Sequence, residues 1–103
     1  MFARVTMFEI DTLRISTDAA LKQFKESIVP EARKQAGYAG MYVMTTPEGK
    51  GLILSLWSSK EAVTAGVESG YYEKQLAKFV TLFRTPAGRE HYELVFSEGP
   101  GQK

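Results

Sequence analysis

Hydrophobic positions along the chain alternate with a period of two in four short stretches and follow a helical period in two longer ones. The alternating stretches are 2–10, 38–46, 52–57 and 91–96, and they are rich in β-branched and aromatic residues, so we predict four strands. Helical spacing over 17–35 and from residue 59 to about residue 83 predicts two helices. The order strand, helix, strand, strand, helix, strand indicates an α+β, ferredoxin-like fold: a four-stranded antiparallel sheet with both helices on one face.

Local signals place the ends of the first helix. Ser16 or Thr17 is the predicted N-cap, and Gly37 follows the last turn. Pro30 falls inside the helical pattern, where it lacks the N–H that a helix needs. We therefore expect a bend near Ser27.

The second helix is predicted to start directly after Trp57, because the residues 58–61 match a capping box with Ser58 as the cap and Glu61 reaching back to it. Two glycines, Gly66 and Gly70, weaken its first stretch. We expect a shorter helical piece, a break at 69–70, and a longer piece that ends before 85–88.

Both alternating sets of the strands contain large apolar side chains. In the second strand, for example, Tyr42 and Met44 belong to one set and Met41 and Val43 to the other. Helices on one side leave the other face of the sheet bare, and a bare apolar face of this size is an aggregation hazard. We therefore predict that the chain forms a homodimer through its sheet faces, across a two-fold axis.

Composition narrows the possible functions. The chain has 103 residues, which predicts one domain over 1–97 followed by a flexible polar tail over 98–103. A net charge of +1 without a basic cluster argues against nucleic acid as a partner. The absence of cysteine and the single histidine argue against a metal site. No signal peptide or membrane span is visible, so we expect a cytoplasmic protein with no membrane partner.

The stretch GYAGMYVMTTPEGKGLILSLWSSKEA, residues 37–62, resembles a pattern shared by the antibiotic biosynthesis monooxygenase family of dimeric αβ-barrel proteins. The matching positions are Gly37, Tyr38, Gly40, Trp57, Ser59, Glu61 and Ala62. The resemblance implies a ferredoxin-like monomer paired into a dimeric αβ barrel, with a pocket between sheet and helices in each subunit. Members of the family include cofactor-independent oxygenases of phenolic or quinol substrates, heme-degrading enzymes, and proteins without an assigned reaction.

The chain departs from the residues that the family's enzymes use. Heme-degrading members rely on an asparagine in the first strand, a tryptophan in the second helix and a histidine further along it. The corresponding positions here include Gly66 and Leu76, and the chain contains no asparagine. Heme degradation by the family's route is therefore disfavoured, and so is an oxygenase mechanism that depends on a pocket asparagine. No cofactor is expected.

Aromatic residues are the candidates for a substrate pocket: Phe24, Trp57, Tyr72 and Phe79. Trp57 has two interpretations, a plug in the core, which is favoured, and a wall of the pocket. Tyr72, with its neighbour at position 71, lies after the predicted helix break, where a phenol can bind or transfer protons, although packing on the helix is the simpler account. The catalytic residue is left unassigned, with Tyr72 and His91 as weak candidates. An exposed histidine at the start of the last strand is the simpler view of His91.

Two strand residues have alternative interpretations. If Arg4 faces a covered surface, it needs a carboxylate or a ligand anion, because an unpaired buried charge costs several kcal/mol. A salt bridge between subunits is the simpler expectation for Arg4, and anion binding is the alternative. Tyr42 belongs either to the barrel interior or, less often for such positions, to a ligand site.

Two functional hypotheses follow. The first is a cofactor-independent monooxygenase-like protein that acts on a small planar aromatic substrate, phenolic or quinol. The alternative is a noncatalytic dimeric barrel of unassigned activity that binds a small molecule or is associated with stress. Heme binding without degradation is a third, weaker hypothesis. The substrate, and whether the chain is an enzyme at all, are not determined by the sequence.

Overall fold

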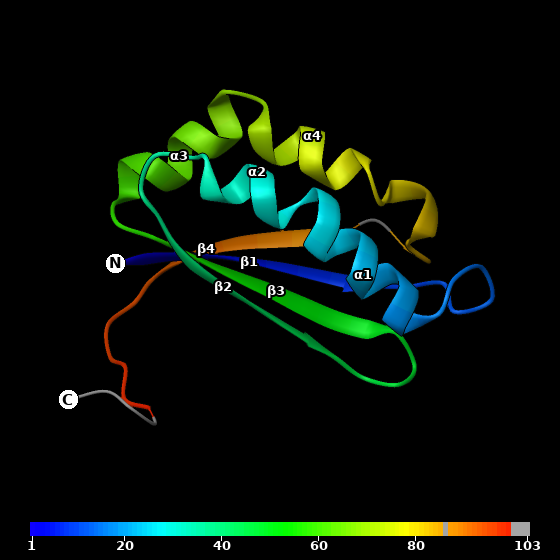
Figure 1. Cartoon of the computed structure of the whole chain (residues 1–103). Helices are drawn as coiled ribbons and strands as arrows, with labels where there is room; N and C mark the ends of the chain where they lie inside the picture. Colours follow the sequence, from blue (N-terminus) through cyan, green and yellow to red (C-terminus); the bar gives the residue numbers. More distant parts are fainter. Residues whose placement is uncertain (86, 100–103) are drawn as a thin grey trace.

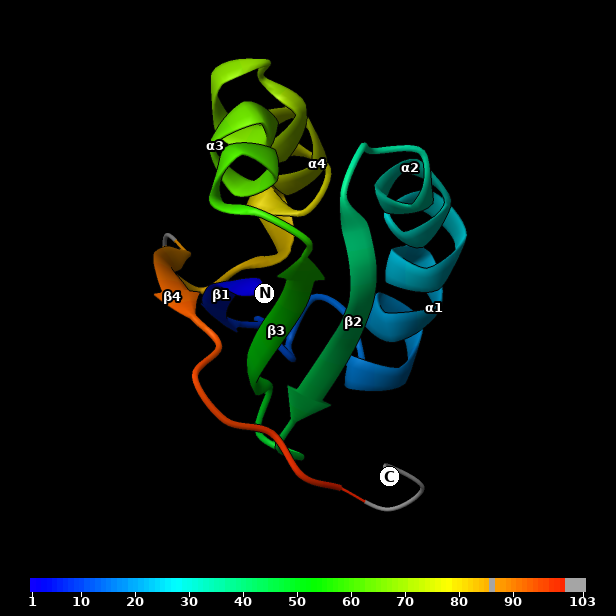
Figure 2. The ribbon, with the colours of Figure 1, turned by 90° about the vertical axis from the view of Figure 1, so that its left-hand side faces the viewer.

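The computed structural model describes residues 1–85 and 87–99. Four strands form one antiparallel sheet in the order β2-β3-β1-β4, and the helices cover one face of it (Figure 1, Figure 2). The strands are β1 (Phe2–Glu9), β2 (Tyr38–Thr45), β3 (Lys50–Trp57) and β4 (Gly88–Glu93). The predicted α+β, ferredoxin-like architecture is confirmed.

The first helical region is split as expected. Helix α1 (Thr17–Ser27) is followed by α2 (Val29–Arg33), with Pro30 in the first turn of α2, where a missing N–H is tolerated. The side chain of Ser16 caps α1 by accepting a 3.1 Å hydrogen bond from the Ala19 N–H. The predicted bend near Ser27 is confirmed.

The second helical region also breaks at Gly70, which has a φ of +83° that favours glycine. It comprises α3 (Lys60–Glu68), α4 (Tyr71–Ala77) and a short 3₁₀ turn, η1 (Val80–Leu82). The prediction that the piece after the break is the longer one is wrong. The chain leaves the helix early to pair with the end of β1, where the Arg84 N–H donates to the Glu9 carbonyl at 2.7 Å.

The predicted cap of the second helix is off by one residue. Ser59 caps α3, accepting a 3.1 Å hydrogen bond from the Ala62 N–H. Ser58 instead closes the junction with β2, since its N–H donates to the Gly37 carbonyl at 2.8 Å. A Cβ on Gly37 would lie 2.6 Å from the Ala62 Cβ, so this junction also requires a glycine.

The last strand begins and ends three residues earlier than the predicted 91–96. Glu93 pairs with Phe2, the first residue of β1, so the sheet offers no further partner strand. Beyond it, Val95 and Phe96 are 84% and 78% exposed, and the chain leaves the sheet on the side away from the helices (Figure 1, Figure 2). Most of the tail predicted over 98–103 lies outside the described residues, so its flexibility stays a prediction.

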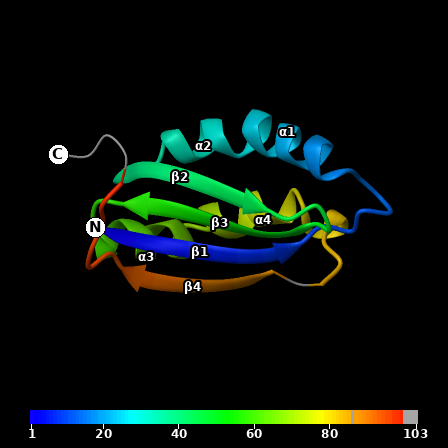
Figure 3. The same cartoon turned by 90° about the horizontal axis from the view of Figure 1, so that it is seen from below.

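The helices leave one face of the sheet open (Figure 3), and most side chains on that face are apolar. The open-face side chains are defined here as Val5, Met7, Tyr42, Met44, Leu52, Leu54, Leu56 and Tyr92, which alternate along the strands with those that face the helices. Four of them, Met7, Tyr42, Met44 and Tyr92, are 47–62% exposed. The two-sided apolar character that the sequence predicts is therefore present, and the dimer stays a prediction.

Within 1–85 and 87–99, no helix combines the length and the apolar character that crossing a membrane requires.

Candidate functional site

A pocket lies between the helix-covered face of the sheet and the helices α1 and α4. Its cavity has a volume of about 90 Å³. The walls come from alternate residues of β1, β2 and β3 and from the inward faces of the two helices. Because strand side chains alternate, the same strands that build the open face on one side build the pocket on the other.

One end of the pocket is apolar. Phe24 of α1, Ile28 and Phe79 are its buried centre, and Phe79 lies with its ring centroid 6.3 Å from that of Phe24 and 6.5 Å from that of Phe83. Such tilted and stacked aromatic pairs are stabilising beyond their buried area. The contacts that Phe24, Ile28 and Phe79 offer a flat ring are apolar.

The other end of the pocket is polar. Trp57 Nε1 donates to Ser55 Oγ at 2.9 Å, and the hydroxyl oxygens of Thr6 and Tyr72 are 2.7 Å apart. The four side chains come from β1, β3 and α4, and each of these residues is at most 8% exposed. We call this group, together with Arg4, the polar end.

Arg4 is the charged residue of the polar end. It is 3% exposed, and its Nη2 donates to the Val63 carbonyl of α3 at 3.0 Å. Its guanidinium carbon lies 5.2 Å from the ring centroid of Trp57 and 4.6 Å from that of Tyr72. Burial lowers the pKa of Arg4, although the neighbouring tyrosines act in the opposite direction.

No carboxylate of the described residues lies within 4.0 Å of the Arg4 side-chain nitrogens, and its buried Nε has no hydrogen-bond partner. Arg4 points to the helices and not to the open face, so a partner packed on the open face does not meet its guanidinium. The expected salt bridge between subunits stays a prediction. The guanidinium also fills the space beside Gly66, where a Cβ would lie 2.6 Å from Nη2. Arg4 therefore occupies the place of a side chain at position 66.

The four residues predicted to bind substrate all line this pocket: Phe24, Trp57, Tyr72 and Phe79. Their role in binding stays a prediction. Trp57 is 1% exposed and its N–H has one partner, which agrees with the plug, and its ring also forms part of the wall. The structure supports both interpretations of this residue at once.

The other candidates lie elsewhere. Tyr42 is 62% exposed on the open face, so it does not reach the pocket. His91 is not at the start of β4 but inside it, opposite Arg4 in the register, and it is not part of the pocket wall. Partial burial and the charges of Arg4 and Arg89 lower the pKa of His91. A lower pKa keeps the imidazole neutral near pH 7.

Several polar residues of the wall were not predicted as site residues, among them Thr6, Ser55 and Gln75. Thr6 shares the alternating set of Arg4, and Ser55 shares that of Trp57, so the strand pattern contained the signal. The sequence does not contain the register of β1 with β3, which places Arg4 opposite Ser55 and so brings the set of Arg4 and Thr6 next to the set of Ser55 and Trp57.

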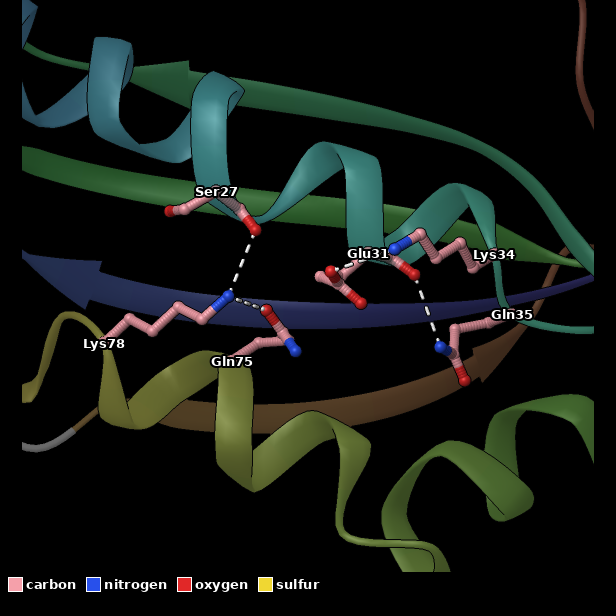
Figure 4. Close-up of polar contacts among 6 residues, drawn as sticks. All are labelled: Ser27, Glu31, Lys34, Gln35, Gln75 and Lys78. Atoms are coloured by element: carbon pink, nitrogen blue, oxygen red, sulfur yellow. Dashed lines mark hydrogen bonds and ion pairs between the residues drawn. The ribbon is translucent and has the colours of Figure 1, made fainter.

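A polar bridge joins the two helical regions above the pocket (Figure 4). Lys78 Nζ donates to the Ser27 carbonyl at the end of α1, at 3.1 Å, and to Gln75 Oε1 at 2.8 Å. Nearby, α2 is tied internally: Lys34 and Gln35 both donate to Glu31, each at 3.3 Å. Lys78 is therefore the side chain that spans from α4 to α1, and Gln75 is both its partner and part of the pocket wall.

Across the part of the chain that the structure describes, no group of three or more His, Cys, Asp or Glu side chains is arranged to hold a metal ion.

No protein-family model and no curated protein matches the sequence. Solved structures do match. The chain is similar to SnoaB, a cofactor-independent oxygenase from Streptomyces nogalater, with a TM-score of 0.74, 8% identity, and 93% of this chain and 94% of that chain covered. It is also similar to the heme-degrader MhuD from Mycobacterium tuberculosis, solved with two hemes bound in its active site, with a TM-score of 0.70, 16% identity, and coverage of 96% and 100%.

A third similar structure is described as an antibiotic biosynthesis monooxygenase, with a TM-score of 0.71, 13% identity, and coverage of 92% of this chain and 99% of that chain. At these identities the similarity establishes the fold. The chain thus has the fold of the antibiotic biosynthesis monooxygenases, as the resemblance in residues 37–62 implied.

Proposed function

We propose that the protein is a cofactor-independent monooxygenase-like protein that acts on a small planar aromatic substrate, phenolic or quinol, in the pocket beneath its helices. The observation that carries this proposal is the division of the pocket into an aromatic end and a polar end with hydrogen-bond donors. A flat substrate with one oxygen substituent matches that division. The shared fold with SnoaB supports the proposal by analogy.

The reaction needs no external reductant. A phenol and dioxygen give a para-quinone and water: one oxygen atom enters the ring, the other leaves as water, and the substrate supplies all four electrons. The phenolate is the form that gives up an electron to dioxygen readily. The protein's task is therefore to bind the ring, favour the phenolate and exclude water.

The chain's own residues fit those tasks. Phe24 and Phe79 hold the ring at the apolar end, and the positive charge of Arg4 favours an anionic oxygen at the polar end. Tyr72 has a hydroxyl at this end and is the candidate for proton transfer. The described wall contains no carboxylate or imidazole, so His91 has no direct part in this proposal.

Substrate binding requires some movement of the wall. The cavity of about 90 Å³ is smaller than the roughly 150 Å³ of an engineered cavity that binds benzene. Gln75 belongs to the wall and accepts a hydrogen bond from Lys78, which also donates to Ser27 of α1, so the Lys78–Ser27 hydrogen bond is one contact that breaks when α4 moves away from α1 (Figure 4).

The second candidate function is a noncatalytic barrel that binds a small molecule or is associated with stress. It is favoured by the absence of asparagine from the chain and by the position of His91 outside the pocket wall. In both cases we propose a cytoplasmic homodimer that pairs through the open face, which supplies the apolar surface such an interface needs. Heme binding without degradation stays the weakest hypothesis, since the Arg4 guanidinium occupies the space that a side chain at Gly66 would take.

Oxygen uptake by the pure protein with hydroquinones, polyphenols and anthrones tests the enzyme hypothesis. We expect uptake with at least one phenol. Tyr72→Phe removes a polar group of the site and Trp57→Phe removes part of its wall, and each should lower kcat/KM at least about tenfold. Tyr92→Phe, which removes a hydroxyl on the open face, is the matched control. Binding of these compounds without turnover would favour the noncatalytic barrel.

A further inference from the structure

The polar end of the pocket has more hydrogen-bond donors than acceptors. Arg4 uses Nη2 on the Val63 carbonyl, which leaves its buried Nε–H without an acceptor. The Thr6 and Tyr72 hydroxyls are 2.7 Å apart, and whichever of them donates, the other retains a free proton. Ser55 Oγ already accepts from Trp57 Nε1 and has the Arg4 carbonyl within 3.5 Å as its own acceptor.

Basic groups of the neighbouring strand lie beside this end. They are Arg89, which is charged, and His91, whose lowered pKa keeps it neutral near pH 7. The only carboxylate bound to this cluster in the described structure is that of Glu73, which pairs with Arg89 at 3.2 Å and is largely exposed. The positive charge of Arg4 is thus left without a counterion inside the protein.

The aromatic contacts of Arg4 stabilise it only in part. Cation–π contacts with Trp57 and Tyr72 attract the charge of the guanidinium but give its N–H groups, which lie along the edge of the planar group, no oxygen acceptor. A carboxylate or a phenolate oxygen in the cavity would accept from that edge and from the free hydroxyl proton. An arginine edge suits such oxygens because its N–H groups form a rigid fork.

We propose that the pocket binds an aromatic ligand that carries an anionic oxygen, and that Arg4 is the residue that binds this oxygen, with the Thr6 and Tyr72 hydroxyl pair as the second donor. The ring lies toward Phe79, and the anionic group, a carboxylate or a phenolate, lies against Nε of Arg4. This deepens the proposed function, on which it rests for the presence of a ring in the pocket. Arg4 would then select anionic over neutral aromatics of the same size.

A matched set of ligands tests this selection: benzoate, phenol and benzyl alcohol, together with 2-naphthoate, 2-naphthol and 2-naphthalenemethanol as the two-ring set. Binding is followed by the fluorescence of Trp57, the only tryptophan of the chain. We expect the carboxylate to bind about 10- to 100-fold more tightly than the alcohol at pH 7, the range of a hydrogen bond to a charged group. A red-shifted absorbance of bound phenol or naphthol identifies a phenolate, and its absence assigns the anionic oxygen to the carboxylate.

Variants then assign the preference to Arg4. Arg4→Met should remove it while the alcohol binds as before, and Arg4→Lys should restore only part of it, because lysine keeps the charge but not the fork. Arg33→Gln, at an exposed arginine of α2 outside the pocket wall, is the control and should retain the preference. If Arg4→Met does not fold, the ¹⁵Nε–¹H signal of Arg4 in the native protein gives the same information: it should move with benzoate and stay with benzyl alcohol.

The outcomes separate this inference from the proposed function. Equal affinity for the carboxylate and the alcohol overturns the role of Arg4 and leaves the aromatic pocket intact. A preference that survives in Arg4→Met, or a silent Arg4 Nε signal with bound benzoate, overturns it as well. Failure of every aromatic in both sets to bind contradicts the proposed function itself.

Discussion

The helix-covered face of the sheet carries polar side chains that are buried, whereas the open face carries apolar side chains that are exposed. On the covered face, Arg4, Thr6 and Ser55 are 3–5% exposed, and on the open face Tyr42 and Met44 are 62% and 54% exposed. This is the reverse of the distribution that favours an isolated monomer. Each face therefore needs something that the single chain does not supply.

The two faces need different things. Exposed apolar surface is stabilised when a second apolar surface buries it, and two copies of this chain provide a matching pair of surfaces by symmetry. A buried positive charge with a free N–H is stabilised by a hydrogen-bond acceptor of negative charge. No described side chain of the chain provides such an acceptor for Arg4. We therefore assign a second copy of the chain to the open face and an anionic aromatic ligand to the covered one.

The largest expected effect is on the open face. Leu54→Glu places a charge in the middle of the proposed interface and should weaken dimerisation at least about 100-fold, because an unpaired charge in an apolar interface costs about 3 kcal/mol or more. Sedimentation velocity over a dilution series measures this. Lys22→Glu on the exposed side of α1 is the control. A wild-type chain that stays monomeric at high concentration would remove the basis for assigning a second copy to this face.

The next effect concerns stability on the covered face. Arg4→Met should raise the free energy of unfolding by about 1 kcal/mol or more, since it removes the desolvation of an unpaired charge and keeps an apolar side chain of similar length. Urea unfolding without ligand measures it. If the variant is instead less stable by several kcal/mol, Arg4 is a structural residue and its binding role loses this support.

An effect of similar size and opposite sign is expected at Ser55, also on the covered face. Ser55→Ala leaves the buried Trp57 N–H without its acceptor and should lower the free energy of unfolding by about 1–3 kcal/mol. Ser27→Ala, which loses only an exposed hydroxyl contact with the Gln23 carbonyl, should change it by less than about 0.5 kcal/mol. Equal effects of the two substitutions would show that the Trp57–Ser55 bond contributes little.

The smallest effect is a pH dependence at the β4 edge of the covered face. The pKa of His91 is lowered in the folded chain, so the unfolded chain binds more protons as the pH falls through the ordinary histidine range. Stability from this group is present above that range and is lost on acidification. His91→Gln should therefore flatten the loss of thermal stability between about pH 7 and 5. Because His91 is exposed, an unchanged slope would mean that solvent screens the effect.

The sequence predicted the elements better than their ends. Alternation and helical spacing depend on local residues, so the element order and the breaks at Pro30 and Gly70 followed from them. The end of β4 depends on where β1 begins, and the N-cap at Ser59 depends on how Ser58 meets Gly37. These are contacts between distant segments, which no local pattern contains.

The site shows the same division. The aromatic residues of the sequence predicted a pocket lined by Phe24, Trp57, Tyr72 and Phe79, because large aromatic side chains are usually buried in the core, where they can contact a flat ligand. The position of Arg4 relative to the helices required the register of β1 with β3 and the contact with Val63, so an ion pair between subunits was expected instead. The free Nε of Arg4, which carries the proposed selection of anionic ligands, is visible only in three dimensions.

The most direct test of the central claim, that the two faces take different occupants, is a methyl NMR spectrum of the isoleucines and leucines under two titrations. Ile28 and Ile53 report on the pocket, and Leu52, Leu54 and Leu56 of β3 report on the open face. We expect benzoate to shift the signals of Ile28 and Ile53, and dilution to shift those of the three leucines. If benzoate shifts only the leucine signals, or if dilution shifts none of them, the assignment of the two faces is contradicted.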